Sequence, residues 1–205
     1  MKKLSTLVLV LFVAFQMTSC KSEKKEDKKE EKVSKAAYVL NEAKNTIDWT
    51  AYKFTEKTGV KGKFKKVNVT SGGEGNTVKE AVNNAEFSIP VGSIFTADSG
   101  RDFKIVKYFF GIMENTKLLS GKLVLENDSL GYANITMNGV TGKLPFKYTI
   151  NGKEFAMSAK MDVMNWNAKQ SIDSLNAICK DLHIGADGIS KLWSEVDITI
   201  SSVFK

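Results

Sequence analysis

The sequence has few of the residues that usually carry metal or redox chemistry. His183 is its only histidine, and Cys20 and Cys179 are its only cysteines. A lone imidazole without a nearby cysteine or acidic cluster makes a poor metal site or general base. We therefore interpret His183 as a residue that complements the dipole in the last turn of a helix. If Cys20 is modified, as the N-terminal segment described below predicts, Cys179 has no partner, so we expect no disulfide framework.

Motifs of the common enzyme classes are also absent. The sequence contains no Gly-x-Ser-x-Gly and no His-Glu-x-x-His. The glycine-rich segment at residues 71–75 lacks the Gly-Lys-Ser/Thr of a phosphate-binding loop, so it predicts a hairpin loop. Because no acid–base constellation is visible, we expect a protein that is not an enzyme and that holds no cofactor and no metal.

Residues 1–19 have the layout of a secretory signal peptide. Lys2 and Lys3 supply a positively charged start, residues 4–15 form an apolar run, and a small-residue cleavage site follows. The apolar run is too short to span a bilayer as a stable helix, and no later run is long enough to do so. The segment therefore predicts export rather than a membrane span.

The cleavage site resembles the lipobox of bacterial lipoproteins. Thr18, Ser19 and Cys20 match it, and Met17 stands where leucine is usual. The resemblance implies that residues 1–19 are removed and that Cys20 carries the lipid. The acyl chains would then anchor the protein stably to a membrane of the cell envelope, on its periplasmic or outer-membrane face. The alternative is an ordinary secretory signal in which Cys20 occurs by chance.

The segment after Cys20 predicts a tether that precedes one domain. Residues 20–37 form the tether, because residues 21–32 interleave lysines with carboxylates and contain no apolar side chain. Residues 38–205, about 170 residues, suit a single domain with one core. Loss of the signal lowers the formal charge from +7 to about +5. The lysines lie among carboxylates and the protein is exported, so we expect no nucleic-acid partner.

Alternation of apolar and polar residues dominates the predicted domain. Phe155, Met157, Ala159 and Met161 share one face of a segment whose other face is polar. This period of two is typical of strands with one buried face. The pattern and the intervening turns predict strands at residues 46–54, 61–69, 83–90, 118–126, 130–138, 143–150, 154–163 and 195–200.

Two segments have helical spacing instead. Residues 101–111 place Phe103, Val106 and Phe110 on one stripe, with Gly111 as the C-cap. Residues 171–182 place a second stripe on one face, made of Ile172, Leu175, Cys179 and Leu182, and we expect Cys179 to be an inert packed thiol. Together these patterns predict an all-β fold: an antiparallel barrel of about eight strands, closed so that it has no edges, with two short helices.

A series of short motifs runs through residues 38–204: Trp49, Gly62-x-Phe64, Ser93-Ile94-x-Thr96, Arg101-Asp102, Phe109-Phe110, the Ile135–Thr141 stretch (ITMNGVT) and a closing strand at residues 196–200. In their order and spacing these motifs resemble the YceI-like family of lipid- or polyisoprenoid-binding proteins, with Asn138 in place of the family's histidine. Residues 165–190 look longer than the family's usual segment. The resemblance implies a lipocalin-like barrel that binds an isoprenoid or similar apolar lipid and performs no catalysis.

The predicted ligand-binding residues are mostly large, deformable side chains. They are Trp49, Phe64, Phe87, Arg101, Phe103, Phe110, Met137, Phe146, Tyr148, Phe155, Met157 and Met161. Methionine adapts to irregular apolar surfaces, which suits a flexible-chain ligand. An eight-stranded barrel can also be filled by its own side chains. The alternative is therefore an envelope interaction or scaffold protein with a filled barrel.

Arg101 stands apart because it is the only arginine in a chain with 30 lysines and arginines. A guanidinium offers a planar, bidentate fork that lysine lacks. A functional arginine would hold a ligand headgroup or fix the helix across the mouth of the barrel. A structural one would form a salt bridge with Asp98 or Asp102. The residues alone leave these interpretations open.

Overall fold

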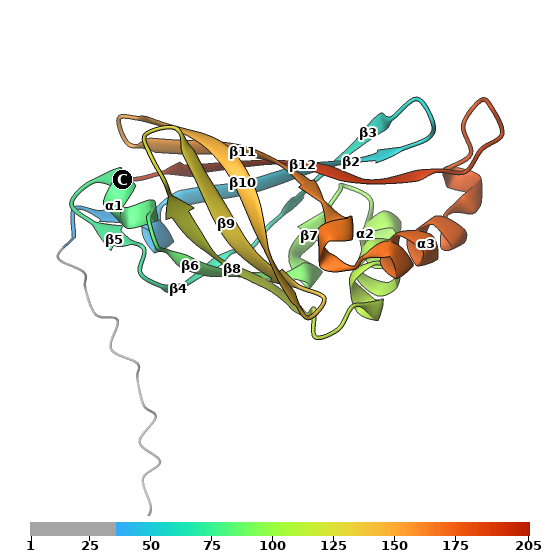
Figure 1. Ribbon diagram of the computed structural model, residues 1–205, viewed down its shortest axis with the longest axis horizontal. Coiled ribbons are helices and arrows are strands. Elements are labelled where there is room, and N and C mark those ends of the chain that lie inside the picture. Colours follow the sequence, from blue (N-terminus) through green and yellow to red (C-terminus); the bar gives the residue numbers. More distant parts are fainter. Residues whose placement is uncertain (1–35) are drawn as a thin grey trace, which may run out of the picture. The chain divides into compact units, whose positions relative to one another are not determined.

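Ten strands of the computed structural model, which describes residues 36–205, form one curled antiparallel sheet (Figure 1). They are β2 Lys44–Lys53, β3 Thr58–Phe64, β4 Asn68–Ser71, β6 Glu86–Pro90, β7 Ile94–Phe95, β8 Leu118–Leu125, β9 Leu130–Met137, β10 Val140–Asn151, β11 Glu154–Asp162 and β12 Leu192–Val203. Their order across the sheet is β4-β6-β8-β9-β10-β11-β12-β2-β3-β7. Two short strands, β1 Tyr38–Val39 and β5 Glu74–Gly75, pair separately. The predicted signal peptide, Cys20 and most of the predicted tether lie outside the described residues.

The alternation along the strands sets which side chains enter the core. On β11, Phe155, Met157, Ala159 and Met161 are all buried, as their shared parity predicts. Met157 lies opposite Tyr148 on β10 and opposite Ile200 on β12. The all-β class and the inward face of these strands are therefore confirmed.

The predicted barrel of about eight strands is confirmed only in part, because the sheet has ten strands and curls into a half-barrel. The expected strand at residues 61–69 is divided between β3 and β4, and β7 continues the course of β6 after a turn. Lys63 lies opposite Phe95 whereas Asn68 lies opposite Ser88, so the two segments between these pairs differ in length and no regular ladder joins them. Pro90, at the start of this break, has no N–H to donate. The sheet is a ten-stranded half-barrel with β4 and β7 as its edges.

The helices also differ from the prediction in number and bounds. The described residues contain three α-helices: α1 Val78–Val82, α2 Ser99–Tyr108 and α3 Lys169–Ile178. Helix α2 begins earlier than expected because the Asp98 side chain accepts a hydrogen bond from the backbone N–H of Arg101, at 2.9 Å. It also ends earlier, so Gly111 is no C-cap and lies in a separate 3-10 turn, η3 Phe110–Ile112.

The two ends of the curled sheet are covered differently. Helix α1 lies with β1 and β5 at one end, and α2 and α3 lie against each other at the other end (Figure 1). Helix α3 ends at Ile178 and is followed by a 3-10 turn, η5 Lys180–Leu182, so Leu182 of the predicted stripe is exposed. None of the helices within residues 36–205 combines the length and the apolarity needed to cross a bilayer.

Candidate functional site

A cavity of about 180 Å³ lies inside the half-barrel at the end that α2 and α3 cover. Strand residues form most of its wall. The rest comes from Ile105 of α2, from Ile172 and Leu175 of α3, and from the turn residues Phe109, Phe110 and Val163. Every described residue that lines it is apolar. Its chemistry is therefore that of a pocket for hydrocarbon.

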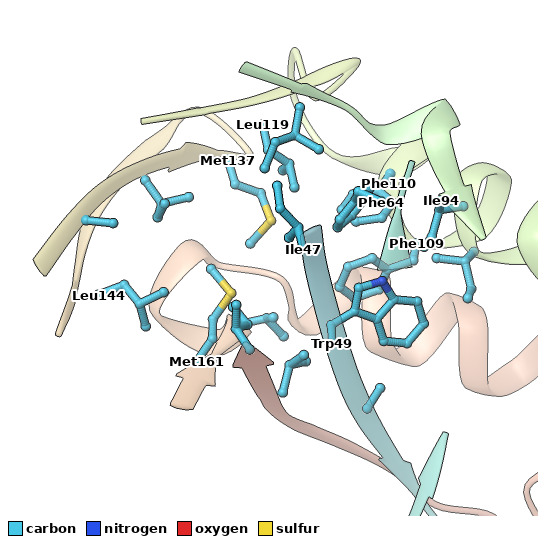
Figure 2. Close-up of a pocket in the computed structure, with 18 of the residues that line it drawn as sticks. Ile47, Trp49, Phe64, Ile94, Phe109, Phe110, Leu119, Met137, Leu144 and Met161 are labelled. Atoms are coloured by element: carbon cyan, nitrogen blue, oxygen red, sulfur yellow. The ribbon is translucent and has the colours of Figure 1, made fainter. Parts of the chain in front are cut away.

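Seven of the predicted ligand-binding residues line this cavity: Trp49, Phe64, Phe87, Phe110, Met137, Met157 and Met161. Figure 2 shows how they divide: Trp49, Phe64 and Phe110 lie on one side, and Met137 and Met161 lie on the other. The aromatic side is tightly organised, with ring centroids 6.4 Å apart for Phe64 and Phe110 and 5.0 Å apart for Phe109 and Phe110. The cavity therefore has a rigid aromatic wall and a flexible methionine wall.

Trp49 is placed by a glycine on the neighbouring strand. Its register partner on β3 is Gly62. A Cβ atom at Gly62 would lie 2.1 Å from Cζ2 of Trp49, so any other residue there would displace the indole. The pairing of Trp49 with Gly62 explains physically why these two residues occur together in the sequence pattern.

Three of the predicted residues pack at the other end of the sheet instead. Phe146, Tyr148 and Phe155 belong to the buried core, and none of them lines the large cavity. The ring centroids of Tyr148 and Phe155 are 5.5 Å apart, and those of Phe146 and Tyr148 are 6.2 Å apart. Phe155, whose exposure is only 1%, borders a smaller cavity of about 50 Å³. These aromatic residues fill the interior there.

The two remaining predicted ligand-binding residues, Phe103 and Arg101, lie outside the cavity. Phe103 is 59% exposed, because the face of α2 that turns inward carries Ile105, with Phe109 one turn further on. The prediction that Phe103 shares a buried helix face with Val106 and Phe110 was therefore wrong.

Arg101 makes an ion pair on the surface near the start of α2. Its Nη2 atom lies 3.7 Å from Oδ2 of Asp98. The pKa of the Asp98 carboxyl is lowered, first by the hydrogen bond from the backbone N–H of Arg101 and then by the guanidinium charge. Asp102 instead accepts hydrogen bonds from the backbone N–H and the hydroxyl of Thr96, at 2.9 and 2.6 Å. A headgroup role for Arg101 stays a prediction.

Several lining residues were not singled out from the sequence. Ile105 and Phe109 could have been found from their i, i+4 spacing, since the alternative stripe on this helix runs through them. Leu192 and Trp193 give no such signal, because the pairing of β12 with β2 is irregular between Leu192 and Val196 and this breaks the alternation.

His183 and Cys179 lie near the helical cover rather than in a chemical centre. The ring Nδ1 of His183 is 2.9 Å from Oδ1 of Asn176, and burial lowers the pKa of the imidazole. Cys179 is buried as a free thiol. Within residues 36–205, no three or more histidine, cysteine, aspartate or glutamate side chains are grouped so as to hold a metal ion.

Two solved structures of known proteins have a fold similar to that of residues 36–205. The described unit is similar to a polyisoprenoid binding domain from Saccharophagus degradans implicated in plant cell wall breakdown, with 13% identity and a TM-score of 0.58 over 83% of this chain and 99% of that one. It is also similar to BcnA of Burkholderia cenocepacia, with 15% identity and a TM-score of 0.52 over 78% of this chain and 96% of that one. At such identities the likeness shows a shared fold.

The sequence itself carries the family assignment. No protein of curated function matches it. The pattern of the YceI-like domain, in contrast, matches residues 38–204, which include the whole curled sheet and both of its covered ends. The resemblance that the motifs around Trp49, Arg101 and Asn138 suggested is therefore confirmed, and the chain belongs to the YceI-like family.

Proposed function

We propose that the protein is an envelope lipoprotein that holds an apolar lipid of isoprenoid type in the cavity of its half-barrel. The observation that carries the proposal is the cavity itself, about 180 Å³ lined entirely by apolar residues. The name of the similar polyisoprenoid binding domain supports the same ligand class. Binding rather than catalysis suits a lining in which none of the described residues is titratable.

The size of the cavity indicates how much lipid it holds in its present shape. An engineered apolar cavity of about 150 Å³ in another protein stays dry and holds one benzene molecule. A cavity of about 180 Å³ therefore accommodates roughly one five-carbon isoprene unit. Burial of such a unit contributes on the order of 4 kcal/mol, at about 0.8 kcal/mol for each carbon group.

A longer chain requires the cavity to grow. Met137, Met157 and Met161 have unbranched side chains that change shape at low cost, so the methionine wall can move. Helices α2 and α3 supply the rest of the cover and are joined to the sheet by turns rather than by strand pairing. We expect the lipid to enlarge the cavity between this cover and the methionine wall.

A lipid assay tests the proposed function. Organic extracts of the full-length protein, purified from its membrane, are analysed by mass spectrometry, and the lipid-free protein is then titrated with phytol. We expect an extracted isoprenoid at close to one molecule per chain and saturable uptake of phytol. Absence of both would contradict the proposal and favour a filled scaffold that acts through its surface.

The proposed location depends on Cys20. The order of positive start, apolar run and Thr18-Ser19-Cys20 supports cleavage before Cys20 and acylation of its thiol. We expect Cys20→Ala to leave the membrane fraction or to accumulate unprocessed, because the acyl chains supply the anchor. Fractionation and gel migration measure this, with Cys179→Ala as the matched control. Unchanged retention and migration of Cys20→Ala would contradict lipidation.

A further inference from the structure

We infer that the bound lipid carries an uncharged hydrogen-bond acceptor, a carbonyl or hydroxyl oxygen, which receives the indole N–H of Trp49 inside the cavity. This inference rests on the proposed lipid binding and deepens it, because it names the chemistry of the ligand's polar end. Trp49 is then a specificity-determining residue rather than only a wall of the pocket.

The indole nitrogens of the three tryptophans differ in their partners. Nε1 of Trp166 donates to the backbone carbonyl of Ile135 at 2.8 Å, and Nε1 of Trp193 donates to that of Phe54 at 2.7 Å. Nε1 of Trp49 is buried, and no described atom of the protein accepts its hydrogen. The whole residue is only 9% exposed. Buried donors in native proteins are nearly always paired, so an unpaired one requires an explanation.

Trp49 lies in the cavity wall, with its Nε1 atom covered by neighbouring atoms. The indole edge that includes Cε2 and Cζ2 lies over Gly62, where a Cβ atom would come within 2.1 Å of Cζ2. Figure 2 shows the nitrogen on the edge of the ring that faces the labelled phenylalanines of the cavity wall. Nε1 has almost no accessible surface, so a ligand reaches it only when a neighbouring side chain moves, but no protein hydrogen bond has to be displaced.

The charge of the lining decides which acceptor is suitable. None of the described lining residues carries a charge, and Arg101, whose guanidinium pairs with Asp98, is not among them. A phosphate or carboxylate at Trp49 would lose its hydration without gaining a counter-charge, which is strongly unfavourable. A neutral oxygen loses less hydration, and one N–H is enough to satisfy it.

The two walls of the cavity then orient the lipid. Figure 2 places Trp49 with Phe64, Phe109 and Phe110 on one side, and Met137, Leu144 and Met161 on the opposite side. The polar end would lie against the rigid aromatic wall, and the flexible hydrocarbon would extend along the methionine wall.

The test compares probes that share one branched carbon skeleton and differ at the polar end, with phytane also lacking the double bond of the other two. Phytol, phytane and phytyl phosphate share one branched hydrocarbon skeleton and end in a hydroxyl, a hydrogen and an anion. Their affinities are measured by equilibrium partition into the lipid-free full-length protein and into its Trp49→Phe variant. Phenylalanine keeps an aromatic ring and removes the N–H. Because both variants meet the same hydrocarbon, the ratio of phytol to phytane affinity isolates the hydrogen bond.

We expect Trp49→Phe to lower the affinity for phytol about tenfold relative to phytane, and the wild type to bind phytyl phosphate at least tenfold more weakly than phytol. An unchanged phytol-to-phytane ratio, or a preference for the phosphate, would overturn the inference while leaving lipid binding intact. Failure of the wild type to bind any probe would overturn the proposed function as well.

A second measurement needs no substitution at Trp49. In the wild-type protein, the indole Nε1–H resonances are observed by NMR while phytol or phytane is added, with Trp166→Phe and Trp193→Phe used to assign them. A new hydrogen bond moves the proton resonance of Trp49 downfield, so we expect that shift with phytol only. The same shift with phytane, or none with phytol, would contradict the inference.

Discussion

The two ends of the half-barrel are built from the same strands but differ in how their interiors are filled. At the α1 end, Phe146, Tyr148 and Phe155 pack against one another from β10 and β11. At the α2 and α3 end, Leu144 and Met161 of these strands border the large cavity. At both ends, alternate residues of β10 and β11 point inward. The position along each strand and the helical cover therefore decide whether the interior is filled or hollow.

At each end of the half-barrel, an aromatic ring packs over a glycine of the neighbouring strand, but the two rings have different surroundings. Phe146 lies opposite Gly131 on β9, where a Cβ atom would come within 2.7 Å of the ring. There the ring completes a packed cluster. Trp49 lies over Gly62 in the same way, in the wall of the cavity, and its buried indole N–H has no acceptor among the described residues. The same ring-over-glycine packing therefore completes a closely packed core at one end, whereas at the other end it holds the indole that we propose as the donor to the ligand.

The largest expected effect is on stability, from Phe155→Ala at the filled end. Truncation of this fully buried ring should lower the free energy of unfolding by about 3–5 kcal/mol, because it removes burial and leaves a cavity in a packed region. Urea denaturation measures the loss, and phytol uptake by the folded fraction should persist. A loss below about 1 kcal/mol would mean that this end is not closely packed.

At the hollow end, Met161→Trp should have its main effect on lipid uptake. The larger indole occupies the space in which we place the ligand, so phytol binding should fall strongly while stability changes by less than about 1 kcal/mol. Phe146→Trp is the matched control, since this residue borders neither cavity and overpacking there should cost about 1–3 kcal/mol without blocking uptake. Equal destabilisation by both changes would remove the distinction between the two ends.

A smaller effect is expected from Arg101→Lys at the edge of the hollow end. The guanidinium pairs with Asp98 at a partly exposed position, so its replacement should cost at most about 1 kcal/mol. Extracted lipid should be equal in the two proteins, because Arg101 does not line the cavity. A reduced lipid yield at unchanged stability would instead restore the headgroup role that the sequence left open.

The smallest effect concerns pH and the helical cover. Burial, and then the nearby Lys53 and Lys104 charges, lower the pKa of His183 in the folded protein. The unfolded chain, with its pKa near 6.5, therefore takes up a proton first as the pH falls, so stability should decline below about pH 6.5. Thermal melts at pH 7.5 and 5.5 should show a smaller difference in His183→Gln. An equal difference in both proteins would assign the pH dependence to other groups.

The sequence by itself determined the strand faces and the family. Met157 and Met161 face inward because a period of two is a local property of extended backbone, which nearby residues already express. The motifs around Trp49 and Arg101 likewise indicated a YceI-like domain, which the family pattern over residues 38–204 confirms.

Only the tertiary structure decided where the ladder of the half-barrel is interrupted and where its interior is hollow. The break between β3 and β4 depends on how that segment pairs with β6 and β7, and Phe103 faces solvent because contact with α3 and the sheet selects the other face of α2. Phe155 and Met161 have the same parity on one strand, yet Phe155 borders only the small cavity at one end and Met161 borders the large cavity at the other. Parity is set by neighbours along the chain, whereas packing depends on side chains that come from distant strands and helices.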